Sequence, residues 1–167
     1  MKVVMYISQT INGFIAKEND ETPWSEEVWK SYYAFAKKFK AIILGKKTYE
    51  IMKDAKEFEK IGNPLVIVLS NKKQSSDDAI FVNSPKDAIS FLNKKGFTEV
   101  ILGGGARANT SFLKENLIDE IYLDIESKIF GSGISLFTKS TFEINLQLVS
   151  AKKISDNLVQ LHYKIKK

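Results

Sequence analysis

The sequence lacks cysteine altogether and has a single histidine, His162, in the strand-like C-terminal run LVQLHYKIK. A thiol nucleophile, an iron–sulfur cluster and a zinc site of cysteine and histidine ligands are therefore excluded, and we expect no metal. No apolar run approaches the ~20 residues of a membrane span. The first residues form a β-like run rather than a signal peptide. These absences predict a cytoplasmic protein with no membrane partner.

Arginine is almost absent as well. Arg107 is the only one, so the net charge of +5 over 167 residues comes from lysine. The lysines occur in scattered pairs, whereas nucleic-acid-binding proteins gather them into a stripe. We therefore expect no nucleic-acid partner, and the charge leaves room for a small anionic ligand. With three prolines and nine glycines, no linker divides the chain, and residues 1–167 are expected to form one domain.

Apolar, β-branched runs alternate with amphipathic stretches along most of the chain. Strands are expected at residues 2–8, 41–44, 65–69, 80–82, 99–102, 119–130, 143–152 and 158–165. Four helices are expected after Ser25, Gly45, Ser84 and Gly105, and they should end near residues 39, 52, 94 and 115. This alternation predicts a single α/β domain with a mixed, mostly parallel eight-stranded sheet that ends in an antiparallel hairpin.

Two glycine-containing turns follow buried strands, where the ligands of open α/β sheets bind. Free amides and the positive dipole end of the following helix favour an anion at each turn. The first turn consists of Gly45, Lys46, Lys47 and Thr48, and the second of Gly103, Gly104, Gly105, Ala106 and Arg107. Neither matches G-x-G-x-x-G or a P-loop. The alternative for each is a plain strand-to-helix connection with solvated cations.

The second turn is the more unusual of the two. Three consecutive glycines are costly in conformational entropy, so the run suggests that a backbone or a ligand lies against it. The planar guanidinium of Arg107 suits bidentate phosphate contact better than a lysine does. Two anion-binding turns on one sheet predict a ligand with more than one phosphate, and a dinucleotide fits that description.

Six short motifs follow one another over nearly the whole chain. They are SQTINGFIA from Ser8, the pair Pro23-Trp24, ILGKKTYE from Ile43, EVILGGGARAN from Glu99, LIDEIYLDI from Leu117, and GSG from Gly131 followed by Leu136-Phe137. Their order and spacing resemble the dihydrofolate reductase superfamily. The resemblance is greatest to the reductase domain of the bifunctional deaminase-reductases of riboflavin biosynthesis and to their stand-alone relatives.

The resemblance implies NADPH as cofactor and hydride transfer from C4 of its nicotinamide. In that superfamily the turns that resemble residues 45–48 and 103–107 bind the pyrophosphate and ribose parts of the cofactor. The family usually has arginine where Lys46 stands, so a point charge replaces a bidentate grip here. The region that faces the adenosine and its 2′-phosphate is similar to Leu69, Ser70, Asn71 and Lys72. Lys72 favours NADPH over NADH.

The substrate side departs from the pattern. Dihydrofolate reductases carry a carboxylate on the helix after the Pro-Trp pair, but Trp29 stands at that position here. Glu27, one turn earlier, is either the replacement acid or a helix-start charge. Asp124 stands where the family has threonine, and it faces either the substrate cleft or solvent. Our candidates are Asp124 and Glu27 for catalysis, and Trp24, Trp29, Tyr33 and Asp124 for substrate contact.

The resemblance also implies that residues 12–24 form a mobile loop that closes over the nicotinamide, with Ala16 near the ring. It implies a homodimer paired through sheet edges, and we expect any deaminase to be a separate chain. The implied substrate is a ribosylamino-pyrimidine phosphate, as in riboflavin biosynthesis. Two alternatives stay open. One is a dihydrofolate or pterin reductase, and the other is a non-catalytic NADPH-binding protein that has lost its substrate carboxylate.

Overall fold

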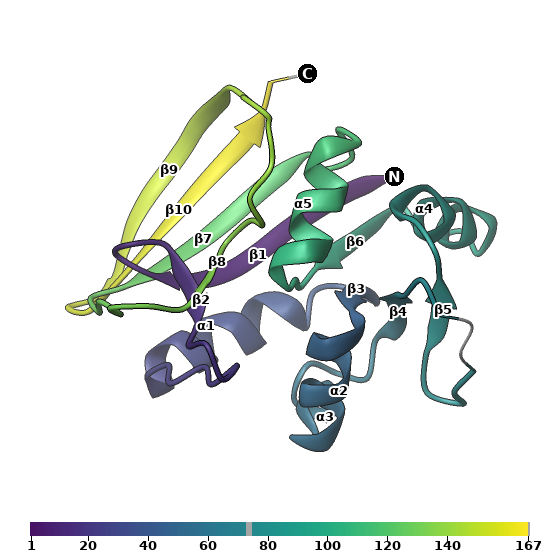
Figure 1. Ribbon diagram of the computed structural model, residues 1–167, viewed down its shortest axis with the longest axis horizontal. Helices are drawn as coiled ribbons and strands as arrows, with labels where there is room; N and C mark the ends of the chain where they lie inside the picture. Colours follow the sequence, from purple (N-terminus) through teal and green to yellow (C-terminus); the bar gives the residue numbers. More distant parts are fainter. Residues whose placement is uncertain (73–74, 167) are drawn as a thin grey trace.

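The chain folds around an eight-stranded sheet with the strand order β5-β4-β3-β6-β1-β7-β10-β9 (Figure 1). The computed structural model describes residues 1–72 and 75–166. The first six strands of this order pair in parallel, and β10 runs antiparallel to both β7 and β9. The strands are β1 (Lys2–Thr10), β3 (Ala41–Gly45), β4 (Leu65–Leu69), β5 (Ile80–Val82), β6 (Glu99–Leu102), β7 (Glu120–Glu126), β9 (Leu146–Ser155) and β10 (Leu158–Ile165). The predicted mixed, mostly parallel sheet is confirmed.

All four predicted helices are present and begin where their start signals place them. Ser25 and Ser84 cap two of them, because their hydroxyl oxygens accept the backbone N–H of Val28 at 3.4 Å and of Asp87 at 3.1 Å. A fifth, short helix was not predicted, since four residues are too few to show a helical period. The helices are α1 (Glu26–Ala36), α2 (Lys46–Asp54), α3 (Glu57–Lys60), α4 (Pro85–Lys94) and α5 (Ala106–Lys114).

Some strand limits differ from the prediction. β7 ends at Glu126, not at residue 130, because the chain turns there: the N–H of Lys128 donates to the carbonyl of Glu126 at 2.7 Å. β9 begins at Leu146 rather than at residue 143. A second, two-stranded sheet pairs β2 (Phe14–Ala16) with β8 (Ile134–Ser135). These strands are too short for the alternation of side chains to reveal them.

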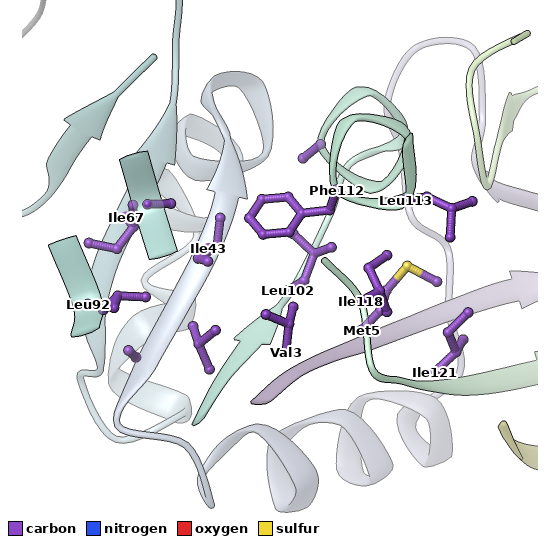
Figure 2. Packing of buried hydrophobic residues seen from close by; sticks show 14 of the residues in the cluster. Val3, Met5, Ile43, Ile67, Leu92, Leu102, Phe112, Leu113, Ile118 and Ile121 are labelled. Carbon is purple, nitrogen blue, oxygen red and sulfur yellow. The ribbon is translucent and has the colours of Figure 1, made fainter. Parts of the chain in front are cut away.

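Two helical layers cover the sheet, and alternate residues of β1 face opposite layers. Val3 and Met5 belong to the apolar cluster beneath α4 and α5, and Figure 2 shows Phe112 of α5 close to Leu102 of β6 in this cluster. Val4 and Tyr6 belong to the cluster that α1 and α2 cover. Within the described residues, no helix is both long enough and apolar enough to cross a membrane. The carboxyl ends of β1, β3, β4 and β6 emerge together between these layers.

Candidate active site

The two glycine turns lie side by side at the carboxyl edge of the sheet, because β3 and β6 are neighbouring parallel strands. The N–H of Gly45 donates a 2.7 Å hydrogen bond to the carbonyl of Gly104. The N–H of Gly103 donates a 3.0 Å hydrogen bond to the carbonyl of Ile43. The structure thus brings together the two segments, residues 45–48 and 103–107, that the sequence assigns to one ligand.

Packing within the chain requires the triple glycine. Gly104 has a φ of +90°, a conformation that residues with side chains rarely adopt. A Cβ on Gly105 would lie 3.1 Å from the hydroxyl oxygen of Thr48, and a Cβ on Gly103 would lie 2.9 Å from Cδ2 of Leu44. The close approach expected from the sequence is therefore present, and side chains of β3 and α2 supply it.

The helices that follow these turns start without a side-chain cap. Gly45 precedes α2 and Gly105 precedes α5, and glycine has no side chain that could accept the first amide hydrogens. By contrast, serine hydroxyls cap α1 and α4. Uncapped amides at a helix start, together with the positive end of the dipole, form a site for an anion. Two such starts at one sheet edge suit two linked anionic groups.

Three cations lie in the first turns of these helices. Lys46 pairs with Glu50 of the same helix at 3.6 Å, and Lys47 pairs with Asp20. Arg107 is exposed and pairs with no carboxylate in the part of the chain that the structure describes. The guanidinium is therefore free to contact a ligand.

The end of β4 extends this edge beyond β3, since Leu69 is the register partner of Gly45. The N–H of Ser70 donates to the carbonyl of Val82 at 2.9 Å, and the Ser70 hydroxyl oxygen accepts the N–H of Lys72 at 3.2 Å. Asn71 and Lys72 are exposed. The four residues expected to face the adenosine thus form a turn next to the first glycine turn.

The segment expected to close over the nicotinamide is partly regular structure. Ala16, in β2, is buried, and a Cβ on Gly133 would lie only 2.5 Å from its carbonyl oxygen. Glycine at 133 is therefore needed for β2 and β8 to pair. Further along, Trp24 stacks on Phe130 with 5.9 Å between ring centroids. Both ends of the segment are attached to the chain that follows β7.

Asp124 lies beneath α1 and is fully buried, with none of its surface exposed. Its oxygens accept hydrogen bonds from the hydroxyl of Tyr6 and, at 2.9 Å, from the side-chain amide of Gln160. The Tyr6 hydroxyl oxygen also lies 2.9 Å from Oγ of Ser31, on α1. The solvent-facing alternative for Asp124 is therefore wrong. Parallel register pairs Asp124 with Ser8 and Tyr122 with Tyr6 of β1, so Asp124 lies on the same face of the sheet as Tyr6, which packs against α1.

Burial dominates the electrostatics of this network. It raises the pKa of the Asp124 carboxyl, and the hydrogen bonds from Tyr6 and Gln160 offset that effect only in part. Burial, together with the nearby charge of Asp124, also raises the pKa of the Tyr6 hydroxyl, which therefore stays protonated. The network can hold a proton inside the fold, and Ser31, which is partly exposed, links it to the surface of α1.

Glu126 is a second buried carboxylate that the sequence analysis did not select, with 4% of its surface exposed. One of its oxygens accepts the N–H of Ser25 at 3.1 Å, and the other lies 3.3 Å from Nζ of Lys128. That amine also donates to the carbonyl of Pro23 at 2.5 Å. Glu126 thus attaches the start of α1 to the end of β7. The sequence signal that could have identified Glu126 is its position two residues after Asp124, which places both side chains on the same face of β7.

The remaining candidates lie on or beside α1. Glu27 is exposed, and its carboxylate accepts a hydrogen bond of 2.5 Å from the hydroxyl of Ser155 at the hairpin turn. Trp29 and Tyr33 stack on each other with 5.8 Å between ring centroids, and Nζ of Lys60 lies 3.4 Å from the Tyr33 hydroxyl. These side chains form the outer surface of α1, whereas Asp124 lies beneath it.

Two surface hollows lie away from these residues. One is lined by Tyr49, Lys53 and Phe81, between α2 and β5, and the other by Lys40 and Lys95 near the amino ends of the strands. Ligands of open α/β sheets bind at the carboxyl ends of the strands. We therefore place the candidate site at the glycine turns and not in either hollow.

The sequence matches known proteins over most of its length. The family model described as RibD C-terminal domain matches residues 1–160. The uncharacterized protein YwjB of Bacillus subtilis is 31% identical over 97% of this chain and 97% of its own length. A putative dihydrofolate reductase of Caenorhabditis elegans is 30% identical over 81% of this chain and 77% of its own length.

Solved structures share the fold. A putative riboflavin biosynthesis protein from Shewanella sp. PV-4 superposes with a TM-score of 0.85 at 24% identity, covering 100% of both chains. A diaminohydroxyphosphoribosylaminopyrimidine deaminase/5-amino-6-(5-phosphoribosylamino)uracil reductase from Thermotoga maritima gives a TM-score of 0.75 at 17% identity, over 99% of this chain and 56% of that chain. With its motifs, its sheet order and a family match over residues 1–160, the chain belongs to the RibD C-terminal domain family, which has the dihydrofolate reductase-like fold.

Proposed function

We propose that the protein is a cytoplasmic, NADPH-dependent reductase that transfers a hydride to a ribosylamino-pyrimidine phosphate such as 5-amino-6-(5-phosphoribosylamino)uracil. The observation that carries this proposal is the pair of uncapped helix starts, α2 and α5, side by side at the carboxyl edge of the sheet. A pyrophosphate has two linked anionic groups, so it matches two adjacent helix starts. The reductase activity in the name of the Thermotoga maritima protein supports the reaction class.

In this proposal the residues of the two turns hold the cofactor. The amides at the starts of α2 and α5, with Lys46, Lys47 and Arg107, bind the pyrophosphate. The turn after β4 faces the adenosine, and exposed Lys72 favours a 2′-phosphate there. The bound nicotinamide would supply a hydride. Ala16 lies in the segment proposed to face the ring.

The substrate would bind beside α1. Hydride transfer to an electrophilic carbon leaves its neighbouring heteroatom in need of a proton. We assign the donation of that proton to Ser31. Tyr6 then returns a proton to Ser31, and Asp124, which enters this step protonated, returns one to Tyr6 and is left as the carboxylate that accepts the Tyr6 hydrogen bond. Trp24, just before α1, and Trp29 and Tyr33, on its outer surface, provide aromatic surface on which a planar pyrimidine can stack. Glu27 is exposed at this surface and is a second candidate acid.

The experiment that tests the function is a titration followed by an assay. NADPH and NADH are titrated into the purified protein while tryptophan fluorescence is recorded. We expect saturable binding that is tighter for NADPH. Oxidation of NADPH is then followed with 5-amino-6-(5-phosphoribosylamino)uracil and, separately, with dihydrofolate. Absence of binding by either dinucleotide would overturn the reductase proposal.

Two alternatives have specific support. The Caenorhabditis elegans relative carries the name dihydrofolate reductase, which favours a pterin substrate. The complete burial of Asp124 favours a protein that binds NADPH without turning over a substrate, because a substrate cannot contact a carboxylate that has none of its surface exposed. Oxidation with dihydrofolate alone would support the first alternative. Tight NADPH binding without oxidation by either substrate would support the second.

We also propose that the protein forms a homodimer through β9. This strand ends the sheet order, so its outer edge has no neighbouring strand among the residues that the structure describes. Several apolar side chains on it are at least two-fifths exposed, among them Leu146, Leu148, Val149 and Ile154. An exposed apolar edge strand is a surface that a second copy can cover.

A further inference from the structure

An ion pair joins the start of α2, which is part of the candidate cofactor site, to the loop between β2 and α1. Lys47 lies in the first turn of α2, and its amine pairs with the carboxylate of Asp20, in the loop between β2 and α1. The lysine side chain is 71% exposed but the aspartate side chain only 21%. The carboxylate is thus packed against α2, while the amine keeps open space around it.

The loop presents Asp20 in a fixed turn. The N–H of Asp20 donates to the carbonyl of Lys17 at 3.0 Å, and the N–H of Lys17 donates to the carbonyl of Glu21 at 2.8 Å. Asp20 itself has a φ of +68°. On the far side of the turn, Lys128 binds the carbonyl of Pro23. Residues 17–22 therefore form a short strap held at both ends, and its middle touches α2 through Asp20.

We propose that Asp20 occupies the place of a ligand anion at Lys47, so that binding of a phosphate group at the start of α2 and release of the strap are linked. Two anions compete for one amine, and a carboxylate left beside a bound phosphate would repel it. Linkage is reciprocal: whatever releases the strap must strengthen anion binding by the same factor. This inference rests on the proposed function only in naming the natural ligand, which is the pyrophosphate of a dinucleotide.

The test compares wild type with Asp20→Asn. Asparagine tolerates a positive φ at least as well as aspartate does, so the turn is preserved while its charge is lost. Asp78→Asn is the matched control, because it removes a carboxylate that pairs with Lys53, near the other end of α2, and changes the net charge equally. Calorimetry at constant ionic strength measures the binding of inorganic pyrophosphate and of NADP⁺. Hydrogen exchange of residues 17–22 is measured with and without each ligand.

We expect Asp20→Asn to bind both ligands about two- to fivefold more tightly, the range set by an exposed ion pair, with no change for Asp78→Asn. In wild type, each ligand should accelerate exchange in the strap, and Asp20→Asn should show that faster exchange without ligand. Unchanged or weaker binding by Asp20→Asn, or protection of the strap by ligand, would overturn the linkage. If pyrophosphate shows the linkage and NADP⁺ does not bind, the linkage holds and the dinucleotide proposal fails.

Discussion

Single residues on β7 show how neighbouring carboxylates acquire different roles. Asp124 and Glu126 share one face of the strand and are both buried. Asp124 meets two neutral donors, Tyr6 and Gln160, whereas Glu126 meets a backbone amide and the cation of Lys128. Neutral donors offset only part of the cost of taking the Asp124 carboxylate out of water, so burial raises its pKa. Asp124 is therefore the member of the pair that suits storage of a proton.

The raised pKa of Asp124 predicts a pH dependence of stability. The Asp124 carboxyl has a pKa of about 4 in the unfolded chain and a higher pKa in the folded protein. Between these two pKa values the unfolded chain is ionised and the folded protein is not, so the free energy of unfolding falls as the pH rises. Asp124→Asn removes this effect. The free energy of unfolding of the variant, relative to wild type, should therefore increase with pH above about 4 until the folded pKa is passed. Urea titrations across this range measure it, and a difference independent of pH would contradict the assignment.

Arg107 carries the prediction for the cofactor side. Arg107→Ala should weaken NADPH binding by about 1–3 kcal/mol, because it removes a charged hydrogen-bond donor to a phosphate. The stability of the free protein should not change, since the side chain is exposed. Fluorescence titration and thermal unfolding measure the two quantities. Unchanged affinity would remove Arg107 from the site.

At the scale of elements, β3, α2, β6 and α5 pack closely because glycines stand at the points where they meet. The start of each helix contacts the other turn: Gly45 donates to Gly104, and Gly105 approaches Thr48. A Cβ on Gly105 would crowd Thr48 at the start of α2, and a Cβ on Gly103 or Gly104 would crowd Leu44 of β3 or Ile7 of β1. The same glycines therefore determine both the packing of the elements and the spacing of the anion site.

Gly104→Ala tests this junction against a matched control. Gly104 and Gly62 both have positive φ, but a Cβ at 104 would lie 3.1 Å from Cδ1 of Ile7, whereas a Cβ at 62 meets nothing within 4 Å. Gly62→Ala should cost about 1–2 kcal/mol of stability from the backbone alone. Gly104→Ala should cost about 1–3 kcal/mol more from crowding and should weaken NADPH binding. Equal costs in urea unfolding would show that the junction is not tightly packed.

At the scale of the whole molecule, the two ends of the sheet differ in their environment. Helices cover both faces of the central strands, whereas nearly all of β9 is exposed. An exposed edge with large apolar side chains is unfavourable for a protein in water. A second copy of the chain that pairs along β9 would bury these side chains.

Leu148→Lys is the variant that tests the dimer, since Leu148 lies within β9 and is 56% exposed. We expect the wild type to elute as a dimer in size exclusion with light scattering and the variant to elute as a monomer. Ile129→Lys is the control, because Ile129 is 69% exposed but lies outside the sheet. A wild type that is monomeric at micromolar concentration would contradict the proposal.

The sequence by itself determined much of the fold and the position of the candidate cofactor site. Helix starts at Ser25 and Ser84 are local signals, because a cap depends on residues within one turn. Buried strands were recognisable as apolar runs, and the glycine turns stood out by composition. The elements α3, β2 and β8 are too short for a helical or strand periodicity of apolar residues to appear.

Only the tertiary structure decided which distant groups meet. The sequence left open whether Asp124 faces the substrate cleft or solvent, because the answer depends on the register between β1 and β7 and on the helix that covers that face. The contacts of Tyr6 with Asp124, of Glu126 with Ser25, and of Asp20 with Lys47 join residues far apart in the chain. Such pairs leave no local pattern, since their partners are selected by the path of the folded chain and not by neighbouring residues.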